Sequence, residues 1–333
     1  MKPFSRAPEE MSKNYEISQT NYGIADVENT GEERAVRATA FVTARMAAEY
    51  IPDPTLLRQN FYKTSMEKLF PNESVPNMGA PCFIELRYKS SENLIQKMLE
   101  RYGEIQVIEL ASGFTAHGLS MTYDHEGVKK WIDNDFEASL RVKQETVNEI
   151  VAGAPIEFIP GSALDETTWQ KFNQRIIPGV PVVIFCEGLM MYFNAEERRR
   201  FFNLVKNFLN DKDGVFFHED ILKYQKDNEE IMHGRSSGDF ANITRQMIER
   251  SEKQHEEAMR ELYGQDEIER EYAGYGFKVE RISENELASL SLDKYPEEVS
   301  VKMTSEEHII HPRQDGEDLI KADFKMWVLS NAK

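Results

Sequence analysis

The residues best able to do chemistry lie in two short segments that follow apolar runs. In Glu109-Leu-Ala-Ser-Gly113 an acid ends the run and a turn of small residues follows, and in Trp131-Ile-Asp-Asn-Asp135 two carboxylates stand two residues apart. On a strand, Asp133 and Asp135 project to one face. In a parallel sheet such a turn receives the charged tail of a nucleotide-like ligand, and an acid after the next strand receives the ribose hydroxyls. The spacing therefore predicts a nucleoside-binding site.

The turn after Glu109 lacks the G-x-G-x-x-G pattern of a dinucleotide site, which favours S-adenosylmethionine over NAD as the cofactor. Backbone N–H groups at Gly113 and at the start of the following helix would receive a carboxylate, and Glu109 would accept a hydrogen bond from an ammonium. Both segments also have ordinary explanations, as a strand-to-helix turn and as a solvated acidic turn that caps a helix. The sequence leaves these alternatives open.

A third segment, Pro181 to Tyr192, has a buried strand followed by an acid. Five apolar residues precede Glu187, and Gly188 follows it. A buried acid needs a partner, and a cationic ligand group near the centre of the sheet would supply one. The adjoining Met191 and Tyr192 are of types more often found in a core, but they could also wall the cavity in which a methyl group is transferred.

Strands and helices alternate along the chain. We predict strands at 105–110, 128–133, 156–159, 182–186, 214–218, 276–282 and 322–329, and helices at 91–102, 136–151, 166–172 and 195–209. Such alternation predicts an α/β fold in which a mostly parallel, doubly wound sheet is joined by right-handed crossovers. The residue alternation of the last strand is typical of an antiparallel edge strand.

Two regions depart from this rhythm. Residues 1–102 are predicted to be an N-terminal segment and helical cap, including a small-residue helix over 33–50 that ends at Pro52 and Pro54. Residues 103–333 then form the cofactor-binding domain. Within it, residues 221–272 are charged and helical in propensity, which predicts a helical insert that acts as a lid. A solvated pair of surface helices is the alternative.

Composition limits the partners. Acidic residues outnumber basic ones by 58 to 40, and the net charge is −18. Such a surface repels phosphate backbones and anionic lipids, so we expect neither nucleic acid nor a membrane as a partner. The chain has no secretory signal and no apolar run of roughly 20 residues, which predicts a soluble, cytoplasmic protein.

Several motifs are missing from the sequence. The two cysteines and seven histidines show neither C-x-x-C nor H-x-x-x-H spacing, so no metal site is expected. There is also no G-x-S-x-G elbow and no Walker loop, which weakens hydrolase and kinase hypotheses.

Taken with Thr39-Ala-Phe-Val-Thr-Ala-Arg45, the three segments resemble the leucine carboxyl methyltransferase family in order and spacing. That family includes bacterial relatives linked to secondary-metabolite O-methylation, and the resemblance covers roughly residues 35–220. It implies a Rossmann-like class I methyltransferase fold and S-adenosylmethionine as cofactor. The contacts it implies are Arg45 and the Gly113 turn for the cofactor's carboxylate, Asp135 for its ribose, Glu187 for its amino group, and Ser162, Ala163 and Leu164 for its adenine.

The sequence departs from this family at two places. It has Thr115-Ala-His117 where the family commonly has Asp-Thr-Arg, and Ala163-Leu164 where the family has Asp-Leu. These departures bear on the cofactor contacts, including the adenine contact, and they keep open a non-catalytic relative that has lost the cofactor.

The function predicted from the sequence is S-adenosylmethionine-dependent O-methylation of a small-molecule carboxylate or hydroxyl, with a polyketide-like metabolite as one class of acceptor. A carboxylate acceptor needs no general base. A hydroxyl acceptor would need one, such as His117 or His218. The sequence identifies no catalytic residue with certainty. A protein C-terminal carboxyl methyltransferase and an NAD-dependent oxidoreductase are the alternative functions.

Overall fold

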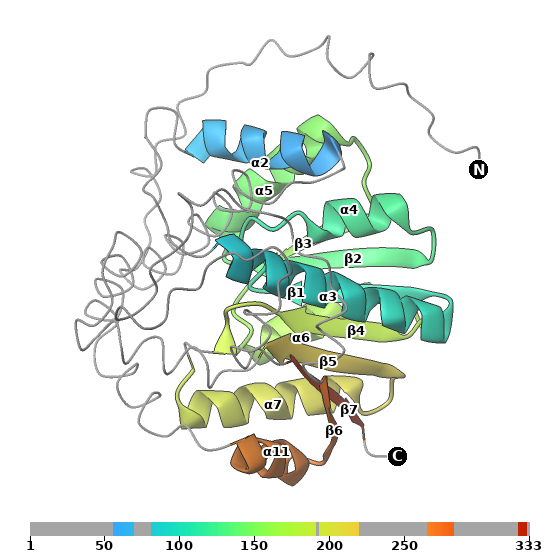
Figure 1. The fold of residues 1–333 in the computed structure, drawn as a ribbon, viewed down its shortest axis with the longest axis vertical. Helices are drawn as coiled ribbons and strands as arrows, with labels where there is room; N and C mark the ends of the chain where they lie inside the picture. Colours follow the sequence, from blue (N-terminus) through green and yellow to red (C-terminus); the bar gives the residue numbers. More distant parts are fainter. Residues whose placement is uncertain (1–55, 70–80, 191–192, 220–264, 283–325, 332–333) are drawn as a thin grey trace, which may run out of the picture.

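The computed structural model describes residues 56–69, 81–190, 193–219, 265–282 and 326–331. A seven-stranded sheet in the order β3-β2-β1-β4-β5-β7-β6 forms its centre (Figure 1). The strands are β1 (Ile105–Leu110), β2 (Val128–Asp135), β3 (Ile156–Pro160), β4 (Val182–Cys186), β5 (Gly214–Glu219), β6 (Phe277–Ile282) and β7 (Met326–Asn331).

Strands β1 to β5 pair in parallel, whereas β7 runs antiparallel to both β5 and β6. This confirms the predicted α/β class and the mostly parallel sheet, with the strand order of class I methyltransferases. The predicted position of the last strand was wrong, because β7 lies between β5 and β6 and the edge strand is β6. The reason is that Met326–Leu329 is apolar on both faces and fully buried, while β6 exposes Lys278, Glu280 and Arg281.

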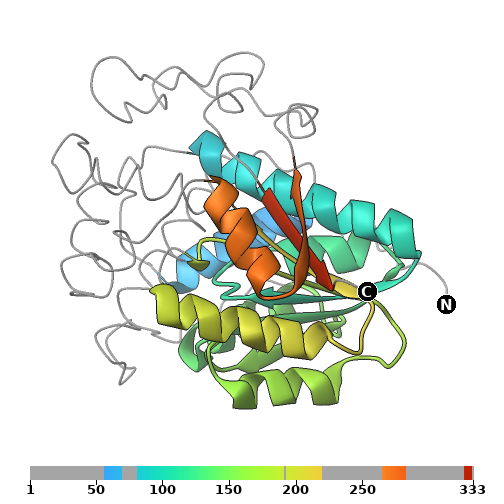
Figure 2. The ribbon, with the colours of Figure 1, turned by 90° about the horizontal axis from the view of Figure 1, so that it is seen from below.

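Seven helices accompany the sheet in the described part of the chain. They are α2 (Leu56–Leu69), α3 (Pro81–Tyr102), α4 (His117–Asp124), α5 (Glu137–Ile150), α6 (Glu166–Arg175), α7 (Ala195–Leu209) and α11 (Gln265–Gly274). Figure 2 shows α3 and α7 on opposite sides of the sheet. Helices α3 and α4 pack on one apolar cluster of the sheet, and α6, α7 and α11 pack on the other.

The helices predicted from the sequence at 136–151, 166–172 and 195–209 correspond to α5, α6 and α7. Helix α3 begins well before the predicted start at residue 91, and α2 was not predicted. The predicted helix at 33–50 and residues 221–264 of the predicted insert lie outside the described residues. The end of that insert forms α11, whose Ile268 and Tyr272 belong to the core of the sheet.

Burial explains the order of the central strands. Every residue of β1 and β4 is buried, which suits two strands covered by helices on both faces.

Among the described helices, none is long and apolar enough to cross a membrane.

Candidate active site at the carboxyl ends of the strands

The sheet has a topological switch point between β1 and β4, because the chain runs outward from β1 to β3 and then returns to β4 on the other side of β1. Open α/β sheets bind ligands beyond the carboxyl ends of the strands at this point. Carboxylates stand at the ends of four neighbouring strands: Glu109 on β1, Asp135 on β2, Glu187 directly after β4, and Glu219 on β5. The first three were predicted as site residues, and Glu219 was missed.

Asp135 contacts the glycine turn directly. Its Oδ2 accepts a hydrogen bond from the backbone N–H of Gly113 at 2.7 Å, and its Oδ1 accepts one from Phe136 at 2.6 Å. Burial raises the pKa of Asp135, while these two N–H groups oppose the rise. The side chain is half-buried. The turn and the acid after the next strand, which the sequence links only by spacing, are thus in contact.

The turn itself holds a strained residue. Ala111 has φ +51°, in the left-handed region that L-residues avoid at a cost of about 1–2 kcal/mol. Gly113, two residues later, has φ +49°, which costs glycine nothing.

We therefore expect Ala111→Gly to stabilise the protein by roughly 0.5–1 kcal/mol, since part of the relief is offset by the greater freedom of glycine in the unfolded chain. Urea unfolding measures the change. Ala273→Gly, at an exposed position of α11, should instead destabilise by up to about 1 kcal/mol. Equal losses in both variants would contradict the assignment of strain at Ala111.

Glu109 is fully buried at the end of β1. Its Oε1 accepts a hydrogen bond from Thr115 Oγ1 at 2.7 Å, and its Oε2 has no hydrogen-bond partner within the described residues. Burial raises the pKa of Glu109 to about 8, although Lys143 and His117 favour its charged form. The side chain is therefore mostly protonated at neutral pH and can donate as well as accept.

This protonation predicts how stability depends on pH. The unfolded chain gives up the Glu109 proton near pH 4.5, while the folded chain keeps it up to about pH 8. Between these values the native state binds more protons, so stability falls as pH rises. Glu109→Gln should remove this pH-dependent part of the free energy of unfolding, which is on the order of a few kcal/mol. Urea unfolding at pH 5, 6.5 and 8 tests it. Glu104→Gln, at an exposed position just before β1, is the control. An unchanged pH slope in Glu109→Gln would contradict the assignment.

Asp133 points into the interior. Its Oδ1 accepts a hydrogen bond from Trp131 Nε1 at 3.0 Å, and its Oδ2 lies 3.0 Å from Lys143 Nζ. Both partners of this ion pair are almost fully buried. Lys143 also donates to Thr115 Oγ1 at 3.2 Å, which connects it to Glu109. Asp133 thus contacts Trp131 and Lys143 in the protein interior. Its predicted contact with the cofactor stays a prediction.

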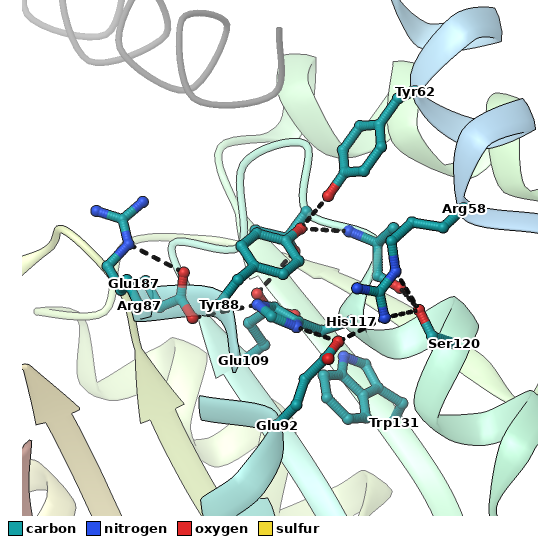
Figure 3. Close-up of polar contacts among 12 residues, drawn as sticks. Arg58, Tyr62, Arg87, Tyr88, Glu92, Glu109, His117, Ser120, Trp131 and Glu187 are labelled. Atoms are coloured by element: carbon teal, nitrogen blue, oxygen red, sulfur yellow. Dashed lines mark hydrogen bonds and ion pairs between the residues drawn. The ribbon is translucent and has the colours of Figure 1, made fainter. Parts of the chain in front are cut away.

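Glu187 belongs to a buried polar network around His117 (Figure 3). Its Oε1 lies 3.1 Å from His117 Nε2, and its Oε2 accepts a hydrogen bond from Arg87 Nε at 3.1 Å. Burial opposes the negative charge, but His117 and Arg87 outweigh it and lower the pKa of Glu187 to about 2. Burial also opposes the charge on His117, yet the neighbouring carboxylates raise its pKa to about 10. Both groups are therefore charged at neutral pH.

Helices α2 and α3 complete this network. His117 Nδ1 lies 3.1 Å from Glu92 Oε1, and Glu92 is held in turn by Arg58 at 2.7 Å. The imidazole stacks on Tyr88, whose hydroxyl accepts a hydrogen bond from the backbone of Ala116. The sequence analysis singled out His117 but did not single out Arg58, Tyr88 or Glu92.

Glu219 and His218, at the end of β5, differ in environment. Glu219 Oε1 accepts a hydrogen bond from the backbone of Gly188, and its buried Oε2 has no hydrogen-bond partner within the described residues. Burial raises the pKa of Glu219 to about 7. Burial lowers the pKa of His218 to about 4, and its ring stacks on Phe216. His218 is therefore neutral, and it belongs to the aromatic packing on the other face of the sheet.

The remaining predicted site residues are less informative. Ser162, Ala163 and Leu164 form a turn after β3, in which Trp169 Nε1 donates to the carbonyl of Ala163 at 2.8 Å. This places the predicted adenine segment at the same edge of the sheet as Asp135. Arg45, Met191 and Tyr192 lie outside the described residues.

Comparisons with known proteins show only distant likeness. No family model and no curated protein sequence matches the chain. A DUF574 family protein of Streptomyces avermitilis has a TM-score of 0.47 at 10% identity and covers 88% of this chain and 97% of its own. An O-methyltransferase of Bacillus cereus in complex with SAH has a TM-score of 0.40 at 9% sequence identity, and the match covers 89% of this chain and 100% of that protein. An O-methyltransferase family protein of Burkholderia thailandensis has a TM-score of 0.37 at 12% sequence identity, and the match covers 91% of this chain and 72% of that protein. TM-scores and sequence identities this low give no evidence about the chemistry of the site, which must be argued from its own geometry.

Proposed function

We propose that this chain is an S-adenosylmethionine-dependent methyltransferase that acts on an oxygen of a small molecule. The observation that carries the proposal is the contact between the Asp135 carboxylate and the backbone of Gly113 at the carboxyl ends of β1 and β2. This contact joins the acid expected for ribose to the turn expected for the charged tail, next to the switch point of the sheet.

The donors and acceptors present fit such a cofactor. Asp135 already accepts two backbone hydrogen bonds, but a carboxylate offers about four acceptor positions, so it can still receive ribose hydroxyls. Glu109 Oε2 is a buried oxygen with no partner in the described structure, which suits a polar ligand group at the end of β1. Glu187 is ionised and could favour an ammonium, although His117 and Arg87 compete for it.

When bound, the cofactor supplies a methyl group that is already activated on sulfur. The main task of the protein is therefore to align the acceptor with that methyl group and to exclude water. The ion pairs of Glu187 with His117 and Arg87 hold these three charged side chains in fixed positions next to the proposed cofactor site.

A hydroxyl acceptor would need a base, and the two histidines considered from the sequence are poorly suited. His117 is charged and enclosed by Glu92 and Glu187, so it has no free nitrogen to accept a proton. His218 is held within the aromatic core on the other face. Glu219, with a pKa of about 7 and a buried oxygen that lacks a partner in the described structure, is the better candidate.

The finer parts of the proposal rest on sequence and charge. The four sequence segments favour a relative of the leucine carboxyl methyltransferases. The net charge of −18 favours a small organic acceptor over nucleic acid or a membrane. The structure adds no observation in favour of an NAD-dependent oxidoreductase.

Calorimetric titration with S-adenosylmethionine and S-adenosylhomocysteine tests the proposal, with NADH as the comparison ligand. We expect saturable binding of both sulfur compounds at one site and no binding of NADH. Absence of binding for both sulfur compounds would rule the function out.

A further inference from the structure

Arg198 is a buried cation with two guanidinium nitrogens that have no hydrogen-bond partner within the described residues. It lies in the first turn of α7 and is only 2% exposed. Its Nη1 donates to the carbonyl of Phe193 at 2.9 Å, which fixes the guanidinium at the N-terminal end of the helix. Within the described residues, its Nε and Nη2 have no hydrogen-bond partner and its guanidinium forms no ion pair.

The neighbouring acids are occupied elsewhere. Glu197 caps the helix, since its Oε2 accepts a hydrogen bond from the backbone of Asn194 while its own backbone N–H donates to Asn194 Oδ1. Asp165 lies 3.8 Å from Arg200, which is exposed. One turn further along α7, Phe201 and Phe202 belong to the apolar core of the sheet.

This arrangement is unfavourable without an anion. Burying a charge that has no partner is costly, and the positive end of the helix dipole adds to that cost for a cation in the first turn. Both effects reverse for a negative ligand, because the cation and the helix end then attract it together. The chain has an excess of acids, yet none of those described lies within hydrogen-bond or ion-pair distance of this guanidinium.

We infer that the N-terminal end of α7 is a binding site for an oxyanion, held by Arg198 through Nε and Nη2. These two atoms form the edge of the guanidinium that presents parallel N–H groups, which match two oxygens of a carboxylate or a phosphate. The site goes beyond the proposed cofactor contacts, which involve β1, β2 and the turn after β3. It lies at the same edge of the sheet, because α7 follows the segment that leaves β4 at Glu187.

Two sources of this chemistry are possible: free phosphate, or a carboxylate carried by a small organic molecule such as the acceptor. Thermal unfolding of the full chain in inorganic phosphate, in acetate and in chloride at equal ionic strength distinguishes them. At a hundredfold excess over Kd, a ligand that binds the folded chain should raise Tm by roughly 4 °C. A rise in phosphate alone identifies a phosphate-type ligand, and a rise in acetate identifies a carboxylate. No rise in either overturns the inference.

Adjacent arginines provide the matched control. Arg198→Met should abolish the rise in Tm, whereas Arg199→Met removes the same charge from an exposed position of the same helix and should leave the rise intact. An equal rise in Arg198→Met would show a general salt effect and overturn the site.

If Arg198→Met does not fold, Arg198→Lys takes its place. Lysine keeps the charge but lacks the paired N–H edge, so we expect binding of the effective anion to weaken about tenfold. Undiminished binding in this variant overturns the role of the edge.

A repeat of the measurement with saturating S-adenosylhomocysteine separates this site from the cofactor site. A persistent rise supports two sites, and loss of the rise means that the anion occupies the cofactor's place, which overturns the inference. If S-adenosylhomocysteine does not bind at all, only the proposed function fails, because the response to anions is measured without it.

Discussion

Replacing Asp135 by alanine is expected to weaken S-adenosylhomocysteine binding by roughly tenfold to a hundredfold. Hydrogen bonds to a charged group contribute about 1.5–3 kcal/mol, and the ribose hydroxyls would lose a carboxylate acceptor. The turn would also lose its anchor, because Asp135 Oδ2 receives the N–H of Gly113. Calorimetric titration of the parent and the variant measures the ratio of dissociation constants.

The control for Asp135→Ala must remove the same charge nearby without touching the turn. Glu137→Ala meets this need, since Glu137 is exposed in the first turn of α5. Asp133→Ala does not, because it would leave the buried Lys143 without its carboxylate and so lower stability by itself. Parent-like affinity in Asp135→Ala, with an unchanged Tm, would remove Asp135 from the site.

The sequence predicted the sheet well because its strands are marked by local pattern. Apolar runs such as Val182–Cys186 end at a turn or an acid, and helix-length segments separate them. Helix α7 carries its own start signal, since Asn194 and Glu197 form a capping box in the structure. The place of β7 could not be read in this way, because strand order depends on pairing between segments far apart in the chain.

Part of the geometry of the candidate site could be predicted from the sequence for the same reason. Asp135 and Gly113 each belong to a recognisable strand-to-turn pattern, and their contact spans only 22 residues. Two contacts of the network around His117 join residues much further apart, since 70 residues separate His117 from Glu187 and 100 separate Arg87 from Glu187. Local spacing carries no signal for such pairs.

The protonation of a buried acid is equally invisible in sequence. Glu109, Glu187 and Glu219 are the same residue type at the ends of neighbouring strands, yet burial raises the pKa of Glu109 and Glu219 while His117 and Arg87 lower that of Glu187. Cations act on all three carboxylates, but only at Glu187 do they contact the carboxylate directly and outweigh the effect of burial. One such cation had a detectable signal, because Lys143 follows Leu140 by three residues and precedes Val147 by four, on the buried stripe of α5.

Lys143→Met is expected to destabilise the protein by about 3–5 kcal/mol, which is typical when one partner of a buried ion pair is removed. The variant would leave the Asp133 carboxylate buried with only the Trp131 N–H, and Thr115 Oγ1 would lose a donor. Lys129→Met is the control, since its ion pair with Glu104 is at the surface and should contribute no more than about 1 kcal/mol. Urea unfolding gives both values.

A double-mutant cycle then separates the charge from the packing. If the cost arises from an uncompensated carboxylate, Asp133→Asn should recover much of the stability lost in Lys143→Met, because the neutral amide no longer needs a cation. If the cost arises from the lost methylenes and contacts of lysine, the two losses should add. Additive losses would therefore contradict the ion pair as the main support beneath the turn. Recovery would show that Lys143 acts mainly by neutralising Asp133, under the carboxyl ends of β1 and β2 where the ligand is proposed to bind.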